Sequence, residues 1–143
     1  MRTAERVLAA IDTMIAVALP YADVQRNADK PVELSSDGLV IIRDGDPGEP
    51  EVYLSPLTYN FQHRVEIEVA ARDFRDTSGH ELLNQMLEAI GAAVESNRTL
   101  GGVALWLEPE APVLAAVESF GSAPIHWADL TLVAHYITSN PLT

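Results

Sequence analysis

The sequence predicts an α+β domain, in which a small mixed or antiparallel β-sheet is packed by an N-terminal helix and a central helix. Apolar and polar residues alternate from Phe61 to Val69, which is typical of a half-buried strand. From Leu82 to Val94 the apolar residues recur at every third or fourth position, which predicts a surface helix. The same helical pattern runs from Ala4 to Leu19. One apolar sheet face and two apolar helix stripes are buried most simply by packing together.

The bulk composition agrees with one soluble domain spanning residues 1–143. Hydrophobic residues make up 48% of the chain, which is ordinary for a folded protein. The absence of cysteine excludes disulfides, thiolate metal sites and cysteine nucleophiles. The N-terminal segment is too short and too polar to span a bilayer, and it lacks the pattern of a signal peptide. We therefore expect a protein made in the cytoplasm.

The charge balance argues against several partners. The formal net charge is −12, and Lys30 is the only lysine. Phosphate groups are bound by clustered lysine and arginine, and the sequence has no such cluster. Specific nucleic-acid binding and docking on anionic membranes are therefore not expected. An acidic surface is compatible with a wall along which a polyanion passes without sticking.

The first half of the chain predicts a helix and two strands before residue 44. Thr3 is placed to cap the N-terminal helix, and Pro20 ends it. A short strand is expected within Tyr21–Asn27, followed by an irregular connection over residues 28–37. Gly38–Arg43 is apolar on both faces, which predicts a central strand.

Residues 44–59 predict a long, β-hairpin-like arm. Two glycines and three prolines occur in the segment 44–60, and Asp44-Gly45 is a hairpin-turn signal. Glu51–Leu54 is expected to return as an edge strand. The arm carries apolar side chains with nothing obvious to cover them, which predicts contacts with another chain. These side chains are Tyr53, Leu54, Leu57 and Tyr59.

The remaining elements follow the long strand, which we expect to run from Tyr59 to Arg72. Asp76, Thr77 or Ser78 supplies the N-cap of the central helix, which ends near Asn97. The further expectations are a strand over Val103–Leu107, one or two helical turns over Val113–Phe120, a last strand over Trp127–Thr138 and a short mobile tail over residues 139–143.

The polar face of the long strand carries alternating charges, namely Arg64, Glu66 and Glu68, with Arg72 beyond them. Glu66 and Glu68 would lie about 7 Å apart on this face, a spacing that two acids could use to catalyse hydrolysis. With arginines alongside, the interpretation that we favour is a charge ladder, either solvated or paired with a neighbouring subunit.

Motifs for chemistry are weak. The four histidines, at positions 63, 80, 126 and 135, do not show metal-ligand spacing. His63 and His135 could meet across neighbouring strands, but a packing role is the commoner one for a strand histidine. A nucleophile elbow and a phosphate-binding loop are absent, and Asp44-Gly45-Asp46 is only half of a calcium loop. The sequence therefore predicts no catalytic residue, cofactor or metal, and so a protein that is not an enzyme.

The chain as a whole resembles the tail terminator, or tail completion, proteins of long-tailed bacteriophages and phage-derived gene transfer agents. The resemblance rests on the N-terminal helix, the strand Tyr59-x-x-x-His63-Arg64-Val65-x-Ile67-x-Val69 and the helix Leu82-Leu83-x-x-Met86-Leu87-x-x-Ile90. It also rests on the turn Asn97-Arg98-Thr99-Leu100-Gly101-Gly102-Val103 and the ending Ala134-His135-Tyr136-Ile137-Thr138.

The resemblance implies a structural virion protein at the tail–neck junction, made in a bacterial host. Such proteins form rings, usually hexamers, on the head-proximal end of the tail tube. Their partners would be the major tail tube protein and a head-completion protein, with genome DNA passing through the lumen. The alternatives are a head-completion (stopper) or other minor tail protein and, from a different class, a small-molecule-binding or hydrolytic α+β domain.

Overall fold

The computed structural model describes residues 1–31, 33–34, 37–115, 118–119 and 124–143. Helix α1 (Thr3–Ala18) is followed by strands β1 (Asp23–Arg26), β2 (Gly38–Asp46), β3 (Glu51–Leu54) and β4 (Leu57–Ala71). Then come helix α2 (Gly79–Ser96), a 3-10 turn η1 (Leu100–Gly102) and strands β5 (Trp106–Pro109), β6 (Val113–Leu114), β7 (Glu118–Ser119) and β8 (Pro124–Thr138).

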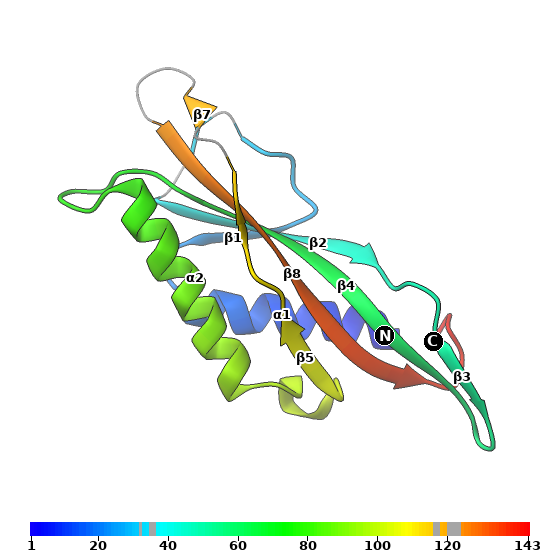
Figure 1. Cartoon of the computed structure of the whole chain (residues 1–143). Helices are drawn as coiled ribbons and strands as arrows, with labels where there is room; N and C mark the ends of the chain where they lie inside the picture. Colours follow the sequence, from blue (N-terminus) through cyan, green and yellow to red (C-terminus); the bar gives the residue numbers. More distant parts are fainter. Residues whose placement is uncertain (32, 35–36, 116–117, 120–123) are drawn as a thin grey trace.

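The sheet is mixed and has the strand order β1-β2-β4-β8-β5 (Figure 1). Strand β1 is parallel to β2, and all other pairs are antiparallel. Strands β4 and β8 form the spine of the sheet, paired without interruption from Tyr59–Thr138 to Ala71–His126. Strand β3 pairs with the free end of β4, and β6 and β7 pair with β8. The predicted α+β class is confirmed.

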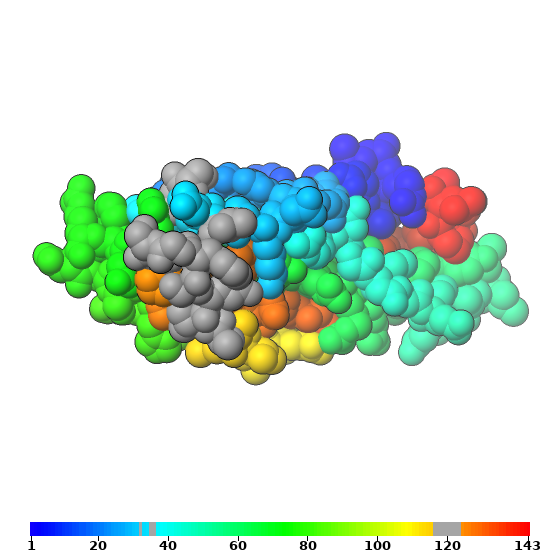
Figure 2. Space-filling view, turned by 90° about the horizontal axis from the view of Figure 1, so that it is seen from above, coloured from blue at the N-terminus to red at the C-terminus, as the bar shows by residue number. Residues whose placement is uncertain are grey.

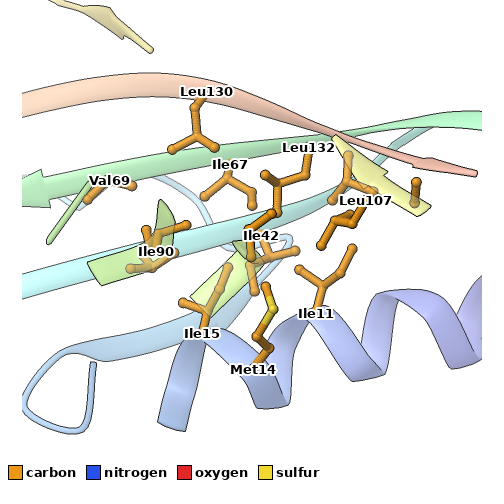
Figure 3. Packing of buried hydrophobic residues seen from close by; sticks show 14 of the residues in the cluster. Ile11, Met14, Ile15, Ile42, Ile67, Val69, Ile90, Leu107, Leu130 and Leu132 are labelled. Atoms are coloured by element: carbon orange, nitrogen blue, oxygen red, sulfur yellow. The ribbon is translucent and has the colours of Figure 1, made fainter. Parts of the chain in front are cut away.

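Both helices contribute to one apolar core on the same side of the sheet. The alternation predicted for β4 is confirmed, because Val65 and Ile67 are buried, Arg64 and Glu66 are exposed and Glu68 is half-buried. Figure 3 shows Ile11 and Ile15 of α1 pointing toward Ile42 of β2, with the β4 and β8 side chains beyond it. Each fully buried side chain of this size contributes about 1.5–3 kcal/mol.

A second, smaller cluster lies on the opposite face of the sheet, against the segment that connects β1 to β2. Its members are Leu34, Leu39, Ile41, Ala70, Ile125 and Trp127. Strand β2 is consequently buried on both faces, as its uninterrupted apolar sequence predicts.

The start of α1 is held by the other end of the chain. The prediction of Thr3 as N-cap is wrong: the cap position is Arg2, which makes no side-chain cap bond. Instead the backbone N–H and the hydroxyl of Thr3 donate to an oxygen of Thr143, at 2.6 and 3.0 Å. Arg2 also donates to the carbonyl of Leu142. The segment 139–143, for which the sequence predicts a mobile tail, is thus bonded to the helix N-terminus, whose free N–H groups need acceptors.

The N-cap of helix α2 is Ser78, one of the three predicted candidates. The hydroxyl of Ser78 accepts a hydrogen bond from the N–H of Glu81 at 3.1 Å. The cap at the other end is Asn97, also as predicted.

Two predictions for the last third of the chain are wrong. Residues 113–114 and 118–119 form short strands on β8 rather than helical turns, and residues 116–117 and 120 of that predicted segment lie outside the described residues. The strand expected from Val103 begins only at Trp106, because the turn η1 precedes it and Gly101 there has a φ of +68°.

Candidate functional site

The predicted arm is a hairpin that extends beyond the helices. Strand β3 pairs with the beginning of β4, and Ser55-Pro56 forms the turn between them. Figure 1 shows this hairpin projecting past the end of the molecule at which α1 begins. In Figure 2 it makes up one end of an elongated molecule, with both chain termini beside its base.

The tip of the hairpin is apolar and exposed. Leu54 is 80% exposed, Tyr53 53% and Leu57 47%. The register pairs Leu54 with Leu57, so these two side chains leave the same face of the hairpin together. Tyr59, the fourth predicted contact residue, is half-buried against the main core. In the isolated chain, three of the four predicted contact side chains are therefore exposed.

The predicted turn at Asp44-Gly45 is wrong. Strand β2 continues to Asp46, and the register with β4 shifts between Arg43 and Asp46, which is a β-bulge. Gly45 has a φ of +67°, and a Cβ there would lie 1.9 Å from the carbonyl oxygen of Arg64. Glycine serves hairpin turns and bulges through the same left-handed conformation, so the dipeptide does not distinguish them. The arm therefore leaves the sheet after residue 46.

His63 packs at the base of the hairpin, as the sequence interpretation favoured. It is 4% exposed, and its ring nitrogens lie 2.8 Å from the Tyr136 hydroxyl and 2.6 Å from the carbonyl oxygen of Asp44. Because a carbonyl only accepts, Nε2 carries the proton, and in the neutral ring Nδ1 accepts from Tyr136. Burial raises the pKa of the Tyr136 hydroxyl. His135 pairs with Gln62 and lies on the opposite sheet face, so the two histidines do not meet.

An ion-pair cluster joins the bulge to α1. Arg26 lies 2.6 Å from Glu5 and 2.6 Å from Asp44. Its hydrogen bonds lower the pKa values of both carboxyl groups. Asp46 accepts instead from the N–H of Gly48. Asp44 and Asp46, the two acids of the half calcium loop, thus each interact with a different group.

The charged face of β4 finds partners within the chain. The pairs are Arg64–Glu110 at 2.6 Å, Arg43–Glu68 at 2.8 Å, Lys30–Glu68 at 4.0 Å and Arg72–Asp37 at 3.7 Å. Hydrogen bonding from Arg64 lowers the pKa of Glu110. Glu66 is exposed on the same face, opposite Thr131 of β8. The pairing of these charges with a neighbouring subunit stays a prediction.

Sequence reasoning missed an open groove between the two helices, on the side away from the sheet. It has a volume of about 860 Å³. Its lining is uncharged and rich in alanine, consisting of Ala9, Ala10, Thr13, Met14, Val17, Ala18, Ala89, Ala92, Ala93, Ser96, Asn97, Leu100 and Gly101. The available signal was the run of alanines on both helices, but their meeting depends on how the helices cross.

Within the described ranges, no group of three or more histidine, aspartate or glutamate side chains is placed to hold a metal ion. In the same part of the chain, no helix is both long and apolar enough to cross a membrane.

Comparison with solved structures finds chains of similar fold. No protein-family model and no curated protein matches the chain. A solved structure of a sheath/tube terminator, from the extracellular contractile injection system PVC in its extended state, is similar to 94% of this chain. The sequence identity is 16% and the TM-score is 0.41, and the chain spans 56% of that protein's length.

Proposed function

We propose that this chain is a tail terminator: a structural protein that forms a ring, six subunits in number, on the head-proximal end of a phage-type tail tube. In this role it ends tube polymerisation and presents a surface to a head-completion protein. The observation that carries the proposal is the projecting hairpin, whose apolar tip is exposed in the isolated chain. Exposed apolar residues gathered at one place are typical of a protein–protein contact.

The sequence resemblance supports the same role. The turn from Asn97 to Val103 and the ending from Ala134 to Thr138 carry the resemblance. In the structure, Asn97 caps α2 and its side chain accepts from the N–H of Gly101, so this segment fixes how the chain leaves the helix. The net charge of −12 supports a subunit that lines a path for DNA without binding it.

The experiment uses the major tail tube protein encoded in the same genome. Tubes assembled with and without this chain are compared by negative-stain electron microscopy. We expect shorter tubes that carry a ring at one end when the chain is present. A variant in which residues 53–58 are replaced by Asn-Gly serves as the matched control and is expected to leave tubes uncapped. Tubes of unchanged length without end density would contradict the proposal, and binding to a completed tail but not to a bare tube would favour a stopper.

A further inference from the structure

Two uncovered apolar surfaces on this chain are free of charge. The hairpin and the start of β4 contain no charged residue from Val52 to Gln62. The groove between α1 and α2 has no charged residue in its lining. In each surface one aliphatic side chain stands out, Leu54 at 80% exposed and Val17 at 75%.

The charge of the chain limits which surfaces of two copies can meet. At a net charge of −12, two copies repel one another over most of their surfaces. Like charges placed opposite each other in a contact cost several kcal/mol. A contact between the hairpin tip and the groove avoids this cost, because neither surface carries charge.

The two surfaces differ in the bulk of their side chains. The groove is open because alanines line both of its walls, leaving about 860 Å³ where larger side chains would otherwise meet. The hairpin presents Leu54 and Leu57 as a directly opposed pair on one face. A two-stranded tip with two adjacent leucines supplies the bulk that the groove lacks.

The hairpin of one chain does not reach its own groove. The hairpin projects from the end at which α1 begins, whereas the groove is lined by α1 from Ala9 onward and by the second half of α2 (Figure 1). We infer that the hairpin tip of one copy, with Leu54 and Leu57, inserts into the α1–α2 groove of the next copy. Because the two surfaces differ, the contact is head-to-tail, and its repetition closes a ring or continues as a filament.

This inference deepens the proposed function and rests on it for its biological setting, although the chain alone suffices to test it. The chain contains no cysteine, so introduced thiols report only on the chosen positions. In the double variant Leu54→Cys/Ala92→Cys, mild oxidation is expected to give a ladder of disulfide-linked oligomers on a non-reducing gel. The matched control is Leu54→Cys/Glu81→Cys, in which the second thiol is exposed near the start of α2 and away from the groove lining. A ladder no stronger than that of the control would overturn the inference.

A complementation experiment tests the head-to-tail geometry. Leu54→Asp disables the hairpin and leaves the groove intact, while Ala92→Glu disables the groove and leaves the hairpin intact. Each variant alone is expected to sediment as a monomer, and their mixture is expected to form dimers and nothing larger. Circular dichroism is the control that checks whether both variants are folded. Self-association of either variant at the native level, or a mixture that remains monomeric, would contradict the inference.

The results separate this inference from the proposed function. A disulfide ladder without tube capping would support the contact and refute the terminator role. Tube capping by the cysteine variant without a ladder would support the role and refute the contact. Native-level assembly of Ala92→Glu would show that self-association does not use the groove and would also refute the contact.

Discussion

Strand β4 alternates apolar and polar residues from Leu57 to Val69 but lies in two different environments. At Val65 and Ile67 the apolar side chains are buried under α1 and α2. At Leu57, ten residues before Ile67 in the same strand, the side chain is 47% exposed because the helices end before the hairpin. The pattern that builds the core thus continues past the part of the sheet that the chain itself covers. We propose that a partner covers the far end.

The largest expected difference between the two ends concerns folding stability. Leu132→Ala removes a fully buried side chain from the core and should lower the free energy of unfolding by about 2–5 kcal/mol. Leu54→Ala, the matched change at the hairpin, should alter it by less than about 0.5 kcal/mol. Urea denaturation of both variants measures the difference. Comparable losses would mean that the hairpin tip is packed on its own domain.

The second prediction concerns association. Replacing residues 53–58 by Asn-Gly joins Val52 to Tyr59, which are paired in the hairpin, by a short turn and keeps Tyr59 on the core. The domain should remain folded, but self-association should weaken by about 100-fold or more, since each buried leucine contributes about 1.5–3 kcal/mol. Sedimentation velocity at several concentrations measures this loss.

A further expectation for the hairpin is mobility in the free chain and order in the assembly. Limited proteolysis before and after assembly tests it, with cleavage near Ser55 expected only before. Equal resistance in both states would contradict it.

The third prediction uses pH at the base of the hairpin. Arg26 lowers the pKa values of Glu5 and Asp44, so its ion pairs stabilise the fold above the unfolded carboxyl pKa of about 4 and lose this effect as the pH falls. Arg26→Met should therefore cost about 1 kcal/mol at neutral pH, a modest value because both carboxylates are substantially exposed, and less in acid. Arg6→Met, the same change at an exposed position on α1, should show no such pH dependence. The measurement is urea denaturation across the pH range.

The smallest effect on folding is expected on the charged sheet face. Reversing Arg64 and Arg72 together removes an exposed ion pair with Glu110 and a half-buried, longer one with Asp37, so the thermal midpoint of the monomer should change little. Ring formation should be impaired if these charges also set the register between subunits. Normal assembly of the double variant would show that their partners are only the intramolecular ones.

The sequence predicts best where a pattern is local and long. The alternation through Val65 and Ile67 identified β4 and its buried face, and the Ser78 cap and the exposed Leu54 also emerged from local residue types. It fails where the deciding contact is distant. Strands β6 and β7 are two residues each, too short to show a period, and they exist because β8 offers them an edge.

The same reason explains the missed parts of the candidate site. The groove requires the alanines of two helices far apart in sequence to face each other, and no local pattern encodes the crossing of α1 and α2. The bulge at Gly45 depends on the backbone of Arg64 passing close by, which the dipeptide alone does not reveal.

The hairpin and the core share one uninterrupted strand, and this has a mechanical consequence. Strand β4 has 15 residues and, at about 3.3 Å per residue, is roughly 50 Å long. One end of this strand is paired on both sides, with β2 and β8, and the other end carries the hairpin tip. Once the hairpin is ordered in an assembly, a force applied to its tip would therefore tilt the whole subunit. Neighbouring subunits linked through such strands would transmit strain around an assembly as a change in the angle between subunits.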